Sequence, residues 1–491
     1  MRFLTALALL LSLVSAAPRP DGPPGDGTKG DTSATDPRPL VDSARLQKTL
    51  TRKALLDHAS KLIEFAKQDP EGNRGFGGVG HNLTVQYIAK WFAQWPDYYD
   101  VKLQEFVELY SAGTAALSVE GENLEVTEFT YSPSGKPTAE LAAVNNLGCE
   151  AADFPPEVDG RIALISRGTC EFGLKQGPYV PTAGVSQEIG QALLADLAAG
   201  PVVASLDIFS VNENRTTYNV LATTKGGNQD NVVQLGGHTD SIVGPGVNDN
   251  GSGFIAELEV AKALTRYKVN NAVRFSFWSA EEFGLLGAEY YVKNLPESEL
   301  AKIRLYLNFD MIASPNLVYF IYDGDGSAFN LTGPAGSDQI EHLFTDFYKR
   351  NNLPSSQTAF DGRSDYGPFL EIGNIPSGGL FTGAEGIKTA EQAALYGGVA
   401  GEAYDPNYHG KGDDFNNVDI DGWLVNTKAV AHSVATYARS LKGFPVREPP
   451  AGNFTAPARK RHVHLHERGE FNALGERRVR ACGHGHKVTL F

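Results

Sequence analysis

The segment that decides the fold reads, in order, NVVQLGGHT (231–239), SGFIAELEVAKALTRY (252–267), NAVRFSFWS (271–279), GLLGAEYYVKNL (284–295) and IRLYLNFDM (303–311). The first, third and fifth runs are short and apolar, as expected of buried strands. The second and fourth runs are longer and place their apolar residues at helical spacing. This alternation of strands with helices predicts an α/β layer built on a mostly parallel sheet.

The same domain extends to both sides of this segment. Residues 46–67 space Leu and Ile three or four apart and predict an amphipathic helix, and a second helix is expected over 81–95, after the loop GNRGFGGVG. Between these helices and the α/β segment, short strand-like runs broken by Gly, Pro and Asn indicate a small β-rich insert. We therefore predict one domain in two pieces, 46–111 and 226–445, interrupted by the insert 112–225.

Both ends of the chain lie outside this domain. Residues 1–17 combine a basic start, an apolar run over 4–14 and a small-residue cleavage site, which is the pattern of a secretory signal peptide. Residues 18–45 begin with a Pro-, Gly- and Asp-rich stretch and predict a pro-segment or linker. The tail 446–491 is basic and contains five of the eleven histidines. A disordered extension is favoured for it over a metal-scavenging tail.

The overall charge restricts the partners. The chain of 491 residues carries 43 Lys and Arg against 58 Asp and Glu, a net charge of −15. Nucleic acids and anionic membranes require a basic face, so neither is expected as a partner. After the signal segment no apolar run reaches the length of about 20 residues that a membrane-spanning helix needs. We therefore predict a soluble protein outside the cytosol, either secreted or vacuolar, and a monomer.

Cysteines and sequons fit that compartment. Cys149 and Cys170 lie in one stretch and are expected to form a disulfide, which leaves Cys482 in the tail. The sequon at Asn250 lies inside a glycine-rich loop, where a glycan would collide with whatever the loop holds. Glycosylation is therefore expected at the other four sequons, Asn82, Asn214, Asn330 and Asn453.

Histidine and carboxylates follow three successive predicted strands. The first strand ends at His238 and its loop delivers Asp249, the second ends at Glu281 and Glu282, and the third ends at Asp310. The carboxyl ends of parallel strands meet at one edge of a sheet, so these side chains should gather there. Four carboxylates repel one another unless cations neutralise them. Mixed His and carboxylate ligation without thiolate is typical of Zn²⁺.

Five blocks of the sequence resemble one known family. They are GGHTDSIVGPGVNDNGSG (236–253), FSFWSAEEFGLLGAEYY (275–291), NFDM (308–311), FDGRSDYGPF (360–369) and YHGKGDDFNN (408–417). In this order they resemble the two-zinc secreted aminopeptidases, which include fungal secreted leucine aminopeptidase and vacuolar aminopeptidase Y. The resemblance runs from about 46 to 445. It implies a three-layer zinc-peptidase fold, with helices flanking a mostly parallel central sheet.

The resemblance also implies a ligand set for two Zn²⁺ ions per subunit. His238 and Asp310 match ligands of one zinc ion. Glu282 and His409 match ligands of the other ion. Asp249 matches the aspartate that bridges both ions.

Three further residues match groups that act beside the metals. Glu281 matches the general base, and a Glu bound directly to zinc would be a poor base because the ion stabilises its deprotonated form. Tyr408 matches the tyrosine that donates to the oxyanion. Asp240, two residues after His238 in an extended strand, matches the carboxylate that orients this histidine.

Other residues of the matching blocks are assigned more loosely. Arg363 and Asp365 resemble the substrate-side loop of the family, where Arg363 either helps to hold the substrate terminus or forms a structural ion pair. Asp413, four residues after His409, either supports the histidine's segment or has no role at the site.

The insert resembles the protease-associated domain. VDGRIALISRGTCEFGLK (158–175) matches the core of that domain. After this core the family usually continues through an Ala-rich helix and a strand, whereas here Lys175 runs directly into Gln176. We therefore predict a shortened insert.

The leading hypothesis is a secreted zinc aminopeptidase that hydrolyses N-terminal residues from peptides or proteins with a water activated by two zinc ions. A carboxypeptidase of the same fold is an alternative, but it would need a basic pocket, and no Arg cluster lies near the motifs. A one-zinc glutaminyl cyclase would not need every ligand, and all five are present. The remaining alternative is a receptor-like binding protein without catalysis.

Overall fold

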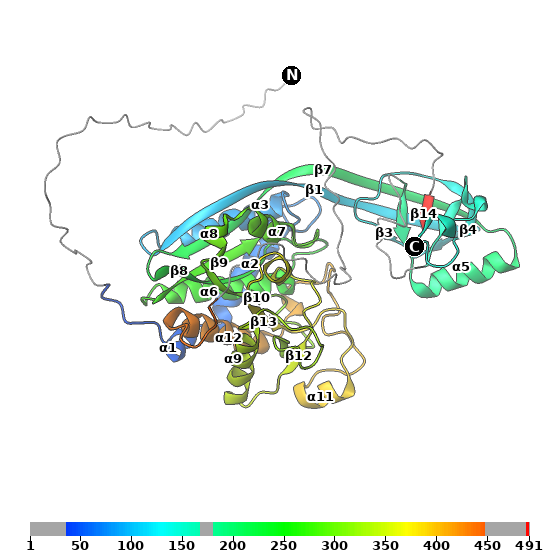
Figure 1. Cartoon of the computed structure of the whole chain (residues 1–491). Coiled ribbons are helices and arrows are strands. Elements are labelled where there is room, and N and C mark those ends of the chain that lie inside the picture. Colours follow the sequence, from blue (N-terminus) through cyan, green and yellow to red (C-terminus); the bar gives the residue numbers. More distant parts are fainter. Residues whose placement is uncertain (1–35, 167–179, 447–487, 491) are drawn as a thin grey trace, which may run out of the picture. The chain divides into compact units, whose positions relative to one another are not determined.

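The computed structural model describes residues 36–166, 180–446 and 488–490 (Figure 1). The described residues from Arg38 onward fall in one compact unit. The helices are α1 (Ser43–Gln47), α2 (Arg52–Ala66), α3 (Val79–Phe92), α5 (Gln187–Ala199), α6 (Gly253–Leu264), α7 (Leu286–Asn294), α8 (Glu297–Leu300), α9 (Ser337–Arg350), α10 (Tyr366–Glu371), α11 (Ala390–Tyr396) and α12 (Ile420–Arg439). Short helical turns are η1 (Ala151–Asp153), η2 (Pro156–Val158), η3 (Val247–Ser252) and η4 (Phe415–Asn417).

The strands form a continuous path through a large domain and an insert. They are β1 (Tyr99–Val119), β2 (Glu122–Leu124), β3 (Thr127–Glu128), β4 (Thr138–Ala143), β5 (Ile162–Leu164), β6 (Thr182–Gly184), β7 (Val203–Thr224), β8 (Asn228–His238), β9 (Asn271–Trp278), β10 (Ile303–Phe309), β11 (Phe320–Tyr322), β12 (Ser356–Thr358), β13 (Ser377–Phe381) and β14 (Val488–Leu490). The large domain contains the order β12-β11-β13-β10-β8-β9-β7, and β1 pairs with β7. The central strands β13, β10, β8 and β9 all pair in parallel. This confirms the predicted α/β class with a mostly parallel sheet.

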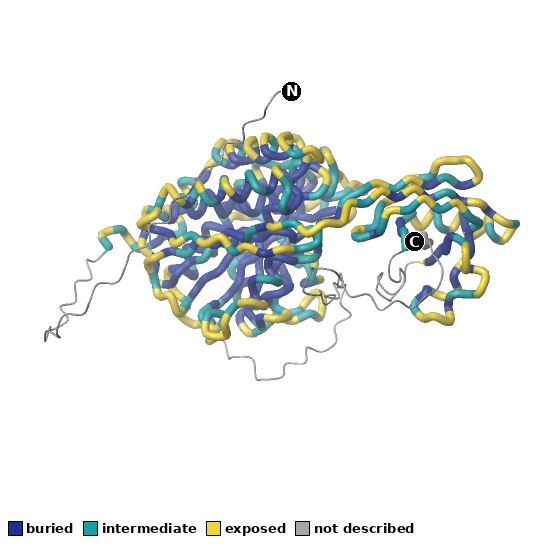
Figure 2. The backbone as a smooth tube through the Cα atoms, turned by 90° about the horizontal axis from the view of Figure 1, so that it is seen from above, coloured by how far each residue is buried: buried dark blue, intermediate teal, exposed yellow. Residues whose placement is uncertain are grey.

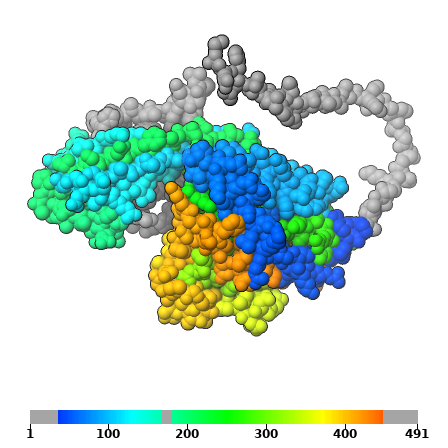
Figure 3. Space-filling model, turned by 180° about the vertical axis from the view of Figure 1, so that it is seen from behind, coloured from blue at the N-terminus to red at the C-terminus, as the bar shows by residue number. Residues whose placement is uncertain are grey.

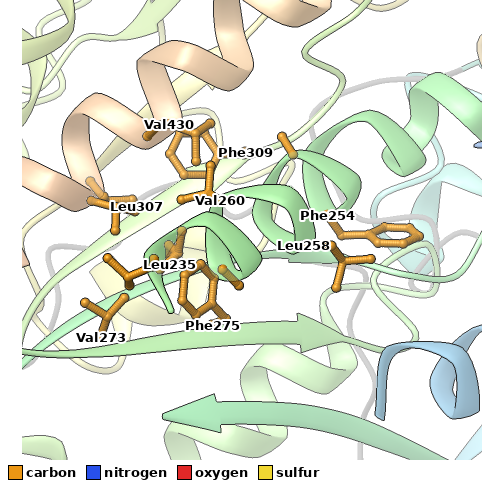
Figure 4. Close-up of a cluster of buried hydrophobic side chains, with 14 of the residues drawn as sticks. Leu235, Phe254, Leu258, Val260, Val273, Phe275, Leu307, Phe309 and Val430 are labelled. Atoms are coloured by element: carbon orange, nitrogen blue, oxygen red, sulfur yellow. The ribbon is translucent and has the colours of Figure 1, made fainter. Parts of the chain in front are cut away.

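Helices cover both faces of the sheet and complete three layers. One face packs against α3, α6, α9 and α12, with α2 packed on α3 and α6, and the other face packs against α7 and α10. Helix α6 is buried at every position except Lys262, because it lies between the sheet and α12. Figure 4 shows apolar side chains of α6, the strands and α12 packed together, among them Leu258, Phe275 and Val430. This core holds the sheet edge that carries the candidate site.

The N-terminal helices differ from the expected single helix over 46–67. The chain forms α1 and α2 instead, because the Thr51 side chain accepts a hydrogen bond from the Ala54 N–H and starts a second helix. Helix α1 packs against α12, which Figure 3 shows from behind. Leu40 pairs with Lys268, and Val41 is fully buried. The large domain therefore begins before residue 46, inside the segment assigned to the pro-segment.

Two long strands connect the large domain to the insert. β1 has 21 residues and β7 has 22, and they pair without interruption from Tyr99↔Thr224 to Val119↔Ala204. Figure 2 shows mainly exposed and intermediate residues along this ribbon, in contrast to the buried interior of the large domain. No break in these strands marks the boundaries expected at 112 and 225, because β7 pairs with β9 of the large domain and with β4 of the insert. The division at these two residues stays a prediction.

In its described residues, the insert is a small sheet with one α-helix, α5. Its strand order is β3-β6-β14-β5-β4, and β4 continues onto β7. Val488–Leu490 form β14 in parallel with both β5 and β6, although the sequence predicts no packing for the tail. The rest of that tail, 447–487, and the segment 167–179 that contains the predicted shortening lie outside the described residues.

Several sequence predictions concern processing and modification. The signal segment, Cys170 and Asn453 lie outside the described residues, so the cleavage, the disulfide and that glycan stay predictions. Asn214 and Asn330 are exposed, whereas Asn82 is half-buried and its Nδ2 donates to Gly77 O at 3.1 Å. Among the described residues, no helix is long and apolar enough to cross a membrane.

Candidate active site

The five predicted ligands come together at one edge of the central sheet. His238 ends β8, and Asp310 follows β10, its parallel neighbour. Glu282 follows β9 on the other side of β8, and Asp249 lies in the η3 turn after β8. His409 comes from a distant loop between α11 and η4, where its backbone adopts a φ of 52°. The strand ends therefore supply three of the ligands, the turn after β8 adds Asp249, and a separate loop adds His409.

The two oxygens of Asp249 face two different histidines. Asp249 Oδ1 lies 3.1 Å from His238 Nε2, which is also 3.4 Å from Asp310 Oδ1. Asp249 Oδ2 lies 3.2 Å from His409 Nε2, which is also 2.9 Å from Glu282 Oε2. Ligand atoms about 2.0–2.2 Å from one tetrahedral zinc ion lie roughly 3.3–3.6 Å apart, so three of these four separations are somewhat shorter than that spacing, and an outward shift of a few tenths of an ångström would give shared coordination. Asp249 is therefore positioned to belong to two adjoining ligand groups.

The electrostatics of the ligand groups favour bound cations. Asp310 Oδ1 is buried and has no hydrogen-bond partner among the described residues. Burial raises the pKa of Glu282 above its usual range. Burial also opposes the charge on His409, but Glu282 and Asp249 outweigh it and raise the pKa of His409 to about 11. The site therefore gathers buried carboxylates whose charge must be balanced by protonated imidazoles or by bound cations.

Asp240 contacts both His238 and the segment of the two glutamates. The Nδ1 atom of His238 lies 3.2 Å from the backbone oxygen of Asp240 and 3.7 Å from its carboxylate. The carboxylate also accepts the backbone N–H of Glu281 at 3.2 Å. The main chain and the carboxylate of Asp240 therefore both lie against the imidazole, and the carboxylate also holds the segment of the two glutamates.

Loop contacts that no local pattern predicts hold two of the ligands. Asp413 accepts the backbone N–H of Asn248 at 2.8 Å and that of Asp249 at 2.9 Å. Ser364 donates to Asp310 Oδ2 at 2.5 Å and accepts from Asn308 at 2.8 Å. Sequence reasoning missed Ser364, although it lies in the matching block between Arg363 and Asp365.

Tyr408 and Arg363 line the pocket above the ligands. The Tyr408 ring stacks on His409, with 3.8 Å between ring centroids. Burial and the nearby carboxylates raise the pKa of Tyr408, so its hydroxyl keeps its proton. The hydroxyl lies 3.4 Å from Arg363 Nη2, and Arg363 pairs with Glu385 at 2.9 Å.

Asp365 does not lie on the substrate side. Its side chain is fully buried, it is not among the residues that line the pocket, and neither of its oxygens has a hydrogen-bond partner among the described residues. Burial raises its pKa well above the usual range. The expectation of substrate contact for Asp365 is therefore corrected, because the start of α10 turns this side chain into the interior.

Comparison with known proteins defines the class. Residues 219–434 match the family model described as Peptidase family M28, and residues 137–177 match the PA domain. The chain is 52% identical over 445 residues to a probable leucine aminopeptidase 2 of Aspergillus fumigatus, covering 84% of this chain and 88% of that protein. It is 50% identical to leucine aminopeptidase 2 of Trichophyton equinum, with 84% and 89% covered.

A solved structure agrees with this placement. An aminopeptidase from Aneurinibacillus sp. strain AM-1 superposes with a TM-score of 0.65 at 25% identity, covering 81% of this chain and 96% of that one. The fold and site thus define a peptide hydrolase of the aminopeptidase type. The chain belongs to peptidase family M28, in its fungal leucine aminopeptidase group, with a PA domain as the insert.

Proposed function

We propose that the chain is a two-zinc aminopeptidase that removes neutral or hydrophobic residues from the N-termini of peptides. The observation that carries the proposal is the position of Asp249, whose two oxygens face His238 and His409. His238 and Asp310 would hold one ion, Glu282 and His409 the other, and Asp249 both. A zinc aminopeptidase from Bacillus subtilis shares the fold, with a TM-score of 0.59. Bound there, zinc would lower the pKa of a water molecule and polarise the scissile carbonyl.

Glu281 is the general base in this proposal. Its Oε2 lies 3.8 Å from His238 Nε2, next to the ligand groups, and its backbone N–H is fixed by Asp240. Burial is the main cause that raises the pKa of Glu281 well above its usual range. A carboxylate with a raised pKa can take a proton from the nucleophilic water and return it to the leaving amine. The protonated hydroxyl of Tyr408 would donate to the oxyanion.

The charges at the pocket favour an N-terminal substrate. The described lining residues include the carboxylates of Asp249, Glu281, Glu282, Asp310 and Asp361. Apart from histidines, Arg363 is the only cation among these described lining residues, and Glu385 pairs with it. Zinc ions would neutralise the three ligand carboxylates, which leaves Glu281 and Asp361 to attract an α-ammonium group, whereas an α-carboxylate would find no unpaired cationic side chain among these described residues. This argues against the carboxypeptidase alternative.

The pocket also supports a preference at the first residue. Met311, Tyr322 and Phe381 line it together with Ala384. These apolar groups would bury an aliphatic or aromatic substrate side chain. The names of the Aspergillus and Trichophyton relatives, leucine aminopeptidase 2, agree with this preference.

The chain is further proposed to be secreted as a monomer, with delivery to the vacuole as the alternative. The signal segment 1–17 supports export. Mass spectrometry of the culture medium and of purified vacuoles, with N-terminal sequencing, would test this directly. Recovery of an uncleaved chain from the cytosol alone would refute it.

The catalytic proposal is tested with leucine p-nitroanilide beside its N-acetylated analogue. The free amine should be hydrolysed, the acetylated form should not, and a chelator should abolish activity that zinc restores. Metal analysis should give two zinc ions per chain, and Glu281→Gln should retain both ions while losing nearly all activity. Equal cleavage of both anilides would refute the aminopeptidase assignment. Inactivity of the wild type with zinc fully bound would favour the receptor-like alternative.

A further inference from the structure

The loop between His238 and Asp249 is held from outside by a buried arginine. Arg74 lies in the glycine-rich loop that connects α2 to α3, far from the ligands in sequence, and is fully buried. Its Nη1 donates to the carbonyl of Thr239, the residue that follows His238. Its Nε donates to Pro245 O at 2.6 Å and its Nη2 to Gly246 O at 2.9 Å. One guanidinium thus bonds both ends of the loop that separates two ligands.

The backbone of the same residue completes the clamp. The Arg74 N–H donates to Ser241 Oγ at 3.1 Å, and its carbonyl accepts the Ser241 N–H at 3.3 Å. Ser241 in turn donates to Gly244 O at 2.7 Å. Gly246 has a φ of 61°, and a Cβ atom there would lie 2.8 Å from Arg74 Nη2. The loop is therefore shaped closely around the guanidinium.

The charge of Arg74 also acts on the site. Burial lowers its pKa to about 10, which still leaves it charged at neutral pH, and Asp240, Asp413, Asp249 and Glu282 favour that charge. The planar guanidinium of an arginine can donate to three carbonyls in fixed directions, whereas the ammonium of a lysine is a point charge on a flexible side chain.

We propose that Arg74 is a positioning residue of the metal centre, which sets the separation of His238 and Asp249 and thereby the affinity for zinc. The inference rests on the proposed two-zinc function. Arg74 is not among the residues that line the pocket, so it acts through the loop and not on the substrate. No pattern around Arg74 predicts this role, because its partners are backbone carbonyls that arrive only when the domain folds.

The test compares zinc affinity in Arg74→Lys, Ser241→Ala and Arg215→Lys proteins by competition with a chromophoric chelator. Arg74→Lys keeps the charge and loses the planar guanidinium, so its zinc dissociation constant should rise about 10- to 100-fold, as when other groups that orient metal ligands are changed. The zinc dissociation constant of Ser241→Ala should also rise, but by less. Arg215→Lys is the matched control, because Arg215 pairs with Glu213 at 2.8 Å and touches none of these loop carbonyls.

Thermal unfolding of the metal-free proteins separates positioning from general stability. At saturating zinc, the KM of Arg74→Lys should stay within about twofold of wild type. If Arg74→Lys and Ser241→Ala both bind zinc as tightly as wild type, the inference is overturned, even where their melting temperatures fall. If Arg74→Lys does not fold, Ser241→Ala against the control decides the matter in the same way. If wild type itself binds no zinc, the proposed function fails first and the inference fails with it.

Discussion

Replacing Asp413 with Asn should weaken zinc binding without touching a ligand. The two oxygens of Asp413 serve different donors, Oδ1 the Asn248 N–H at 2.8 Å and Oδ2 the Asp249 N–H at 2.9 Å. An asparagine offers one oxygen and one NH₂ group, so one backbone donor would face another donor. The peptide that carries the bridging carboxylate would then lose its anchor.

The size of the effect follows from the lost contact. A hydrogen bond to a charged group contributes about 1.5–3 kcal/mol, which corresponds to roughly a 10- to 150-fold change in an equilibrium constant. Burial raises the pKa of Asp413 to about 7, so the carboxylate is fully charged only above that pH. The difference in zinc affinity between wild type and variant should therefore be largest near pH 8.5 and shrink near pH 6.

The raised pKa of Asp413 also predicts how the stability of the metal-free protein changes with pH. The folded metal-free protein holds a proton on Asp413 between about pH 4 and pH 7, whereas the unfolded chain does not. This contribution to stability is present below about pH 4 and is lost as the pH rises through 7. Asp413→Asn should lack that part of the pH dependence.

The assay is chelator competition at pH 6 and pH 8.5, with thermal unfolding of the metal-free proteins between pH 4 and pH 8. Asp414→Asn is the control, because Asp414 caps the neighbouring turn by accepting the Asn416 N–H at 2.8 Å and asparagine caps equally well. Equal zinc affinity of Asp413→Asn and wild type at pH 8.5 would refute the reasoning.

Three further outcomes are expected. Tyr408→Phe should lower kcat about 10²- to 10³-fold with unchanged zinc content, as loss of one oxyanion donor does, and an undiminished kcat would remove Tyr408 from the reaction. Because the pKa of metal-free His409 is about 11, zinc binding at pH 7 should release protons. The zinc affinity should then rise about tenfold per pH unit for each proton displaced. Calorimetry in buffers of different ionisation enthalpy measures the number of protons released. Leu258→Ala should cost about 2–5 kcal/mol of unfolding free energy in denaturant titrations, because Leu258 is fully buried, whereas Leu103→Ala, at a position 52% exposed, should cost far less.

The part of the site that the sequence predicts is the part made by neighbouring strands. Strands of alternating α/β segments run parallel, so residues at their carboxyl ends meet, and the sequence alone predicts that His238, Glu282 and Asp310 lie together. His409 has no such local signal, because it lies in a loop after α11, and only the resemblance linked it to the others.

The sequence by itself determined the class of fold, the edge of the sheet that carries the site and the kind of metal ligands, because hydrophobic periodicity and strand ends are local properties. Only the tertiary structure decided that Asp365 faces the interior, that the carboxylate of Asp240 holds the Glu281 N–H, and that Arg74 and Asp413 hold the ligand loops. These contacts join residues distant in sequence, and many of the partners are backbone groups, which every residue carries. Their pairing is fixed by packing, and no local pattern of side chains can encode it.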